Sequence, residues 1–197
     1  MAKVKFTKNE LKKQKDALKR FQRYLPTLML KKQQLQVEIR QVEARLQEKL
    51  KEKKQLKDSM LNWIAVFGEP FDLDNLLSVE SIETGTGNIA GIDIPLFKEI
   101  TFSEEDYSLF DYPLWVDSGL EALKDLIRFD AEIEILEKQK ELLEDELRIT
   151  SQRVNLFEKV KIPETKENIR MISIFLGDQQ TAAVVRGKIA KSNIVRA

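Results

Sequence analysis

Apolar residues recur at alternating steps of three and four along the first third of the chain. Counted as a heptad repeat with Leu11 at position a, twelve of the sixteen a and d positions up to Trp63 are apolar. A single amphipathic helix on a globular core shows a wider apolar stripe over fewer turns. A repeat sustained over about eight heptads is typical of a coiled coil instead. We therefore predict a coiled-coil helix within residues 1–66.

A second heptad repeat occupies the last part of the chain. In the range Leu126–Met171, nine of fourteen a and d positions are apolar, and the misses cluster after Val154. This pattern predicts a second coiled-coil helix over 116–178 and a C-terminal tail over 179–197. We expect the apolar seam positions of the two helices to pack together. These positions are Leu18, Phe21, Leu25, Leu28, Leu35, Ile39, Val42, Leu46, Leu126, Ile133, Leu136, Leu143, Leu147, Val154 and Phe157.

The segment between the two repeats, 67–115, has a different character. It opens with FGEP, whose Gly and Pro are expected to end the first helix. Two runs follow, LLSVESIE and IDIPLFKEITF. In them, apolar residues, several of them β-branched, alternate with polar residues or stand next to one another. TGTGNIAG separates the two runs. Two such runs around a Gly/Asn turn predict a β-hairpin, and an acidic, aromatic loop follows. The predicted fold is mainly α, a long antiparallel two-helix coiled coil with a small β-hairpin-containing insert.

The charge pattern favours an antiparallel hairpin of helices over a parallel homodimer. The net charge of zero divides into +11 for residues 1–60, −16 for 61–149 and +5 for 150–197. Folding the two helices back on each other brings the basic stretch 40–57 opposite the acidic stretch 132–146. Matching the helix lengths predicts that paired residue numbers add to about 187.

Each predicted helix contains a proline, Pro26 in YLPTLML and Pro163 in KVKIPETK. Proline inside a helix removes a hydrogen bond and clashes with the preceding turn. In the expected pairing the two prolines fall at nearly the same level. We hypothesise that both helices bend there together and share one kink. The alternative is that one proline sits in a frayed or looped turn.

The composition excludes most catalytic chemistry. The chain has no histidine and no cysteine, so it lacks the commonest general base, the commonest transition-metal ligand and any thiolate. The GxGxxxG spacing of TGTGNIAG resembles a dinucleotide loop, but no helix pattern follows it. Acidic pairs on helix and loop surfaces are usually solvated. We expect no catalytic residue, no cofactor and no bound metal.

The N-terminus lacks the apolar core of a signal peptide, and no stretch is apolar enough to span a membrane. The basic residues near both termini are a possible nucleic-acid surface. They are scattered around the helix with few aromatics between them. We therefore expect no nucleic-acid partner and no direct membrane insertion.

The C-terminal stretch RVNLFEKVKIPETKENIRMI resembles the recurrent RVN–LE–IP–I pattern of the D subunits of V/A-type rotary ATPases. The N-terminal stretch FTKNELKKQKDALKRFQRYLPTLMLKKQQL is similar to the opening helix of that family, and the resemblance covers about residues 1–190. The motif residues are Arg153, Val154, Asn155, Glu158, Ile162, Pro163 and Ile169.

The resemblance implies a non-catalytic central-stalk rotor subunit, the axle of a rotary complex. Such a subunit couples ATP hydrolysis or synthesis in the catalytic head to proton or sodium translocation through the membrane rotor. Its implied partners are the catalytic and non-catalytic subunits of the head, a small central-stalk subunit and the socket subunit of the membrane rotor. Its implied place is cytoplasmic, peripheral on the cytoplasmic face of a membrane. The alternatives are a prefoldin-like coiled-coil chaperone or a structural adaptor.

Overall fold

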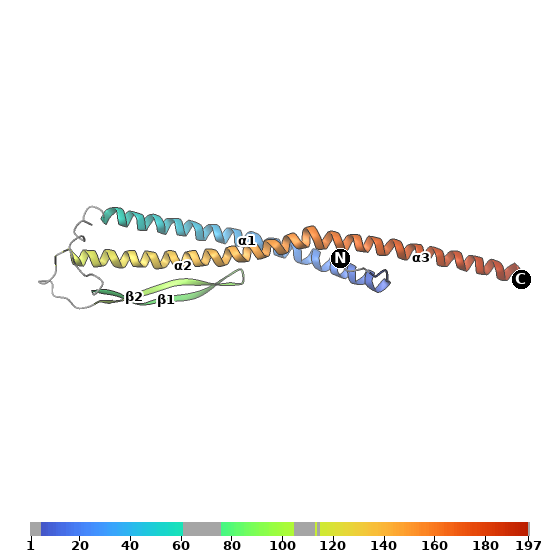
Figure 1. The fold of residues 1–197 in the computed structure, drawn as a ribbon, viewed down its shortest axis with the longest axis horizontal. Coiled ribbons are helices and arrows are strands. Elements are labelled where there is room, and N and C mark those ends of the chain that lie inside the picture. Colours follow the sequence, from blue (N-terminus) through green and yellow to red (C-terminus); the bar gives the residue numbers. More distant parts are fainter. Residues whose placement is uncertain (1–4, 61–75, 105–112, 114, 197) are drawn as a thin grey trace. The chain divides into compact units, whose positions relative to one another are not determined.

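The computed structural model describes residues 5–60, 76–104, 113 and 115–196. Along the chain lie α1 (Lys8–Met60), β1 (Leu77–Ile89), β2 (Ile92–Glu104), α2 (Val116–Asn155), the π-helix η3 (Leu156–Lys161) and α3 (Ile162–Arg196) (Figure 1). The predicted fold class, two long helices with a small antiparallel hairpin between them in sequence, is confirmed. The chain divides into two compact units, one formed by residues 1–32 with 148–197 and the other by residues 33–147.

The helix α1 begins at a capping-box sequence, TKNE. The Glu10 backbone N–H donates to the Thr7 hydroxyl oxygen at 3.2 Å. Such a cap satisfies an amide that the first helical turn leaves without a partner. The helix then runs for 53 residues and passes through Pro26 without leaving helical geometry. Its predicted end near residue 66, with the FGEP stop, lies outside the described residues.

In the unit formed by residues 33–147, the hairpin packs on the paired helices. One buried cluster joins Leu35, Ile39 and Val42 of α1 to Leu143 of α2 and Ile94 of β2. Figure 1 shows the hairpin lying along α2. The insert therefore covers one side of the helix pair, and β2 contributes a residue to the same core as the seam.

The hairpin is longer and its turn tighter than the sequence predicts. Residues 84–89 of TGTGNIAG belong to β1, and the turn is made by Ala90 and Gly91, which have φ of 52° and 82°. Positive φ at both positions gives the two-residue turn that matches the twist of paired strands. The Asn88 side chain supports this turn, since its oxygen accepts from the Gly91 N–H at 3.1 Å.

A second cluster closes the base of the hairpin against the first turns of α2. Its buried members are Leu76, Leu77, Val116 and Leu120. Leu77 begins β1 and pairs with Glu104 at the end of β2, so this cluster fixes both strand ends near the helix start. The acidic loop predicted before α2 falls mostly on residues 105–112 and 114, outside the described residues.

In the unit formed by residues 1–32 and 148–197, the first part of α1 lies against η3 and α3. The rings of Phe6 and Phe175 are 5.1 Å apart, and those of Phe21 and Phe157 are 5.2 Å apart. Aromatic pairs at this separation contribute about 0.5–1.5 kcal/mol beyond their buried area.

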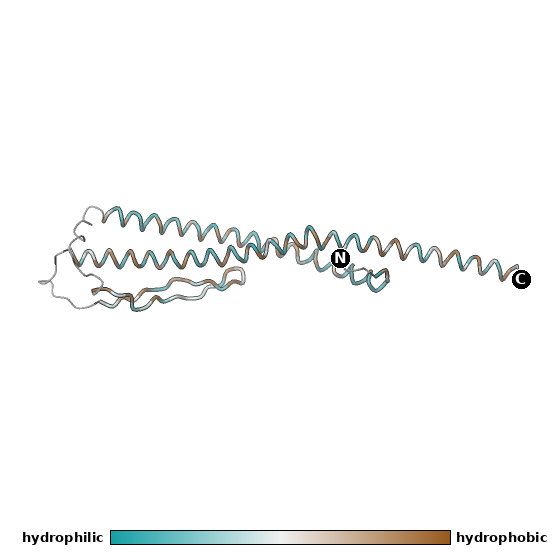
Figure 2. The backbone as a smooth tube through the Cα atoms, viewed as in Figure 1, coloured by the Kyte–Doolittle hydropathy of each residue, from teal (hydrophilic) through white to brown (hydrophobic). Residues whose placement is uncertain are grey.

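The helix α3 does not end near residue 178, where the sequence predicted a separate tail. It continues to Arg196, because residues 179–196 contain no proline and only one glycine to interrupt it. Every side chain described between Gly177 and Val195 is exposed. Several of them are large and apolar, and Figure 2 shows apolar stretches along α3 toward the C-terminus.

Candidate functional site

The fifteen predicted seam residues are all withdrawn from solvent to some degree. Seven are buried, namely Leu35, Ile39, Val42, Leu46, Ile133, Leu143 and Val154. The other eight are half-buried, namely Leu18, Phe21, Leu25, Leu28, Leu126, Leu136, Leu147 and Phe157. Full burial of a leucine-sized side chain contributes about 1.5–3 kcal/mol. The strongest packing therefore lies in the unit that also holds the hairpin, where Leu35 and Leu143 are 0% exposed.

Ion pairs join α1 and α2 in the antiparallel sense. The Lys49 ammonium lies 3.0 Å from a Glu132 oxygen, and the Lys140 ammonium lies 2.9 Å from a Glu43 oxygen. The Lys49 ammonium donates hydrogen bonds to the carboxylates of Glu132 and, with a smaller effect, Glu52, and these bonds raise the pKa of Lys49 above its ordinary 10.5. Lys49 also lies 5.4 Å from the centre of the Phe129 ring. Both pairs are screened by solvent, so they select the orientation of the helices more than they stabilise the fold.

The register of the pairing differs from the prediction. In the pairs Phe21–Phe157, Phe6–Phe175, Lys49–Glu132 and Glu43–Lys140, the residue numbers add to between 178 and 183 rather than 187. The predicted value assumed that both helices end together, whereas α3 extends far beyond the residues that pair with the start of α1.

This register separates the two prolines. The two ring pairs of this unit place Pro26 level with about residues 152–155, near the end of α2, and Pro163 lies eight or more residues farther along the chain. At 1.5 Å per helical residue the offset is at least about 12 Å. The prediction that Pro26 and Pro163 meet at one level is therefore wrong, and with it the basis for one kink shared by both. The looped-turn alternative is also wrong, since both prolines lie inside helices.

A π-helix stands immediately before Pro163. Across Leu156–Lys161 the hydrogen bonds span five residues, and the Ile162 N–H donates to the Phe157 carbonyl oxygen. In an α-helix the proline ring would clash with the carbonyl of Lys159, four residues back. A π turn is wider and holds an extra residue, which relieves that clash. The Thr165 hydroxyl also donates to the Lys161 carbonyl at 2.6 Å and so supplies one of the carbonyls near the proline with a partner.

The π-helix shifts the buried stripe by one residue. Before it, Val154 is buried at the heptad position that the sequence predicts. After it, the predicted positions Glu164 and Met171 are exposed, while Thr165 and Ile172 are 5% and 0% exposed. The sequence pattern indicates part of this register slip, because the apolar stripe after Val154 shifts to Val160, Ile169, Ile172 and Leu176. It does not identify Thr165, whose side chain is polar.

The hairpin adds a polar contact that the sequence does not reveal. The Gln139 side-chain amide of α2 donates to the Pro95 carbonyl oxygen of β2, and Gln139 is 4% exposed. A buried amide without such a partner costs about 1–3 kcal/mol. This bond therefore fixes the hairpin at one position along α2.

The structure gives no support to the nucleotide-loop resemblance. Gly85 and Gly87 lie within β1, and a Cβ at either position would come within 2.9 Å of Lys98 or Leu96 across the hairpin. Another strand follows the turn, so no helix N-terminus is available for phosphates.

Within the described ranges, no group of His, Cys, Asp and Glu side chains is placed to hold a metal ion. Among the same residues, no helix is long and apolar enough to cross a membrane.

Comparison with known proteins identifies the family. The family model for the D subunit of ATP synthase matches residues 10–192. The chain belongs to this ATP synthase D-subunit family. It is 54% identical over 196 residues to the D subunit of the V-type ATP synthase of Borreliella burgdorferi, with 100% of this chain and 97% of the relative covered. It is 36% identical to that of Chlamydia felis and 37% identical to that of Chlamydia muridarum, each over 97% of this chain and 93% or 96% of the relative.

In this member of the D-subunit family, the motif predicted from the sequence spans the π-helix. Its residues Arg153, Asn155, Glu158 and Pro163 are exposed, whereas Val154 is buried. Two further members, Ile162 and Ile169, are half-buried. The motif thus combines one seam residue with several side chains that face away from the partner helix. Membership of this family favours a subunit of an ATP synthase over the prefoldin-like alternative.

Proposed function

We propose that this chain is the non-catalytic central-stalk rotor subunit of a V/A-type ATPase, which couples ATP hydrolysis or synthesis in the head to proton or sodium translocation. The observation that carries the proposal is the family match over residues 10–192 on a chain whose helices pair along an apolar seam. A rotor must transmit torque without twisting apart. Interlocked seam residues and interhelical ion pairs give two helices that stiffness.

The terminal unit supplies the contacts with the catalytic head. Its helix α3 presents exposed apolar side chains, among them Val184, Val185 and Ile189, at 59%, 49% and 55% exposure. Exposing such side chains to water is unfavourable, and burying them in an apolar sleeve is favourable. As the chain turns, each head interface meets a different face of the helix, and differential contact shifts the conformation of each catalytic site.

The unit with the hairpin supplies the contacts with the socket subunit of the membrane rotor and with the small central-stalk subunit. The chain itself acts on the cytoplasmic face of the membrane as a peripheral subunit. Its hairpin carries exposed apolar residues such as Val79, Ile82 and Leu96, which offer a docking surface. The chain supplies no catalytic group, because torque transfer requires only shape and contact.

Reconstitution tests this function. Complexes are assembled in vesicles from purified subunits with and without this chain, and ATP hydrolysis and ion uptake are measured together. The proposal predicts that omission abolishes ATP-driven ion uptake and that adding the chain back restores it. Ion uptake at the full rate without the chain would contradict the proposal. So would failure of the tagged chain to retain the ATPase subunits when it is purified from its native source.

A further inference from the structure

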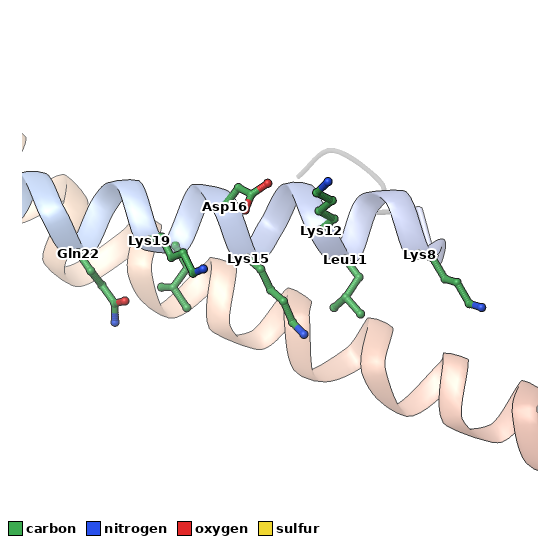
Figure 3. Close-up of a pocket in the computed structure, with 8 residues that line it drawn as sticks. Lys8, Leu11, Lys12, Lys15, Asp16, Lys19 and Gln22 are labelled. Atoms are coloured by element: carbon green, nitrogen blue, oxygen red, sulfur yellow. The ribbon is translucent and has the colours of Figure 1, made fainter.

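A groove with a basic border follows the first four turns of α1. It has a volume of about 530 Å³, and its lining includes Lys8, Lys12, Lys15 and Lys19 together with Leu11 and Leu18. These positions recur at helical spacing, which places them along one side of the helix. In Figure 3 the side chains of Lys8, Leu11 and Lys15 project toward the side on which α3 runs.

The four lysines have no carboxylate partner in the described part of the chain. None of their ammonium groups forms an ion pair or hydrogen bond there. The one acidic residue of the lining, Asp16, projects in Figure 3 from the same edge of α1 as Lys12, whereas Lys8 and Lys15 project from the opposite edge. A row of like charges along one helix face is unfavourable unless a partner supplies the opposite charge.

The acidic residues of α3 at this level are already paired with neighbouring basic residues of η3 and α3. Glu164 lies 3.3 Å from the Lys161 ammonium, and Glu167 lies 2.6 Å from the Arg170 guanidinium. Hydrogen bonds from Arg170 lower the pKa of Glu167, which therefore stays ionised and held by its neighbour. The helix that runs beside the groove thus leaves the lysine row uncompensated.

We propose that this groove binds an acidic helical segment of the ATPase head, a segment with carboxylates one helical turn apart and apolar residues between them. This rests on the proposed function, since it names the chemistry of a head contact. Lysine stems can lie along apolar surface while their ammonium groups reach outward. The half-buried Leu11 and Leu18 then accept the apolar residues, and the ammonium groups meet the carboxylates. Bases of nucleic acid would require stacking partners, and the groove lining contains no aromatic residue.

Zero-length carbodiimide cross-linking of the assembled complex tests the contact directly, because it joins only amines and carboxylates that touch. Mass spectrometry is expected to find Lys8, Lys12, Lys15 or Lys19 joined to acidic residues of a head subunit. The exposed Lys13, on the same turns but outside the groove lining, serves as the internal control. Cross-links from Lys13 as frequent as those from the groove lysines would overturn the proposal.

Two matched triple variants test how much the groove lysines contribute to the affinity for the head. The groove variant carries Lys12→Gln, Lys15→Gln and Lys19→Gln, and the control variant carries Lys13→Gln, Arg20→Gln and Arg23→Gln. Both remove three positive charges from the same helix, and all three control positions are exposed and outside the lining. We expect the groove variant to bind the isolated head about ten-fold more weakly at low salt, mostly through slower association, and to show a shallower salt dependence. The control variant should change the affinity less than about three-fold.

Equal weakening by both variants would overturn the groove proposal and leave the rotor function standing, because the chain would still copurify with the head. Failure of the unaltered chain to bind the head would instead overturn the proposed function. Duplex DNA and phosphatidylserine vesicles serve as further probes. Binding to either probe that is lost in the groove variant and kept in the control variant would assign the groove to that ligand and overturn the acidic-helix proposal.

Discussion

The backbone N–H of Ile162 donates its hydrogen bond to the carbonyl of Phe157, five residues earlier. This one bond marks the place where the long C-terminal helical run changes geometry so that it can pass Pro163. An α turn with one additional residue is a π turn, and every side chain beyond it is displaced by one position in the seam. The burial of Thr165 and Ile172 in place of Glu164 and Met171 is the consequence.

The first prediction concerns a single deletion inside the π-helix. Deleting one residue from a helix rotates everything beyond it by about 100° and normally destroys pairing. Deleting the exposed Lys159 should instead convert η3 to an α turn and keep the seam aligned on both sides. Because the proline would then lie in a regular helix, the deletion is combined with Pro163→Ala. We expect a melting temperature within a few degrees of the parent.

The control for that deletion is removal of the exposed Glu141 from α2, where no π-helix absorbs the change. The chain has no cysteine, so Phe6→Cys with Phe175→Cys can report the pairing through a short bis-maleimide reagent. The cross-link should form in the Lys159 deletion and fail in the Glu141 deletion. Equal cross-linking in the two would show that the π-helix does not set the register.

The second prediction concerns the core shared by α1, α2 and β2. Leu143 is 0% exposed and belongs to the cluster that includes Ile94. Leu143→Ala should lower the free energy of unfolding by about 2–5 kcal/mol, through lost burial and the cavity left behind. The neighbouring Leu142 is 42% exposed, so Leu142→Ala should cost less than about 1 kcal/mol. Urea unfolding measures both, and similar losses would contradict the placement of the hairpin on the helix pair.

The third prediction is a dependence on high pH. Hydrogen bonds that the Lys49 ammonium donates to the carboxylates of Glu132 and Glu52 raise the pKa of Lys49 above 10.5 in the folded chain. A raised lysine pKa stabilises the fold below the unfolded pKa, and this contribution is lost as pH rises through the folded pKa. The parent should therefore lose stability between about pH 10 and pH 12 by up to about 1 kcal/mol more than Lys49→Arg, which keeps its charge. Urea unfolding of the parent and of Lys49→Arg measures this difference. Equal losses of unfolding free energy in the two proteins would exclude a contribution from the bonds of Lys49 to Glu132 and Glu52.

The fourth prediction uses two glycines with opposite roles. Gly91 has φ of 82° in the hairpin turn, and a Cβ there would meet nothing within 4 Å. Gly91→Ala should therefore destabilise the chain by about 1–2 kcal/mol through backbone strain alone. Gly177 lies in α3, is exposed and is equally open, so Gly177→Ala should raise the helical content of α3 and stabilise it by up to about 1 kcal/mol. Circular dichroism during thermal unfolding reports both, and effects of the same sign would contradict the assigned geometries.

The sequence predicted the elements better than it predicted their contacts. Heptad spacing requires only local periodicity, so both helices and the strands flanking Ala90–Gly91 could be identified. The offset between the helices depends on which layers interlock, and a repeat every seven residues fits several offsets equally well. The burial of Ile94 against Leu143 likewise depends on where the insert folds, which no local pattern records. At the candidate site, the periodic signal indicated a register slip near Pro163 but not the π-helix that produces it.

Single-molecule rotation is the most direct test of the proposed rotor function. A cysteine introduced at the exposed Ser81 of β1 would be the only thiol of this chain and can carry a bead while the catalytic head is fixed to a surface. We expect stepwise rotation of the bead in one direction, which requires ATP and stops when ATP is removed. A bead that stays still while the same immobilised complexes hydrolyse ATP and retain this chain would contradict the rotor function.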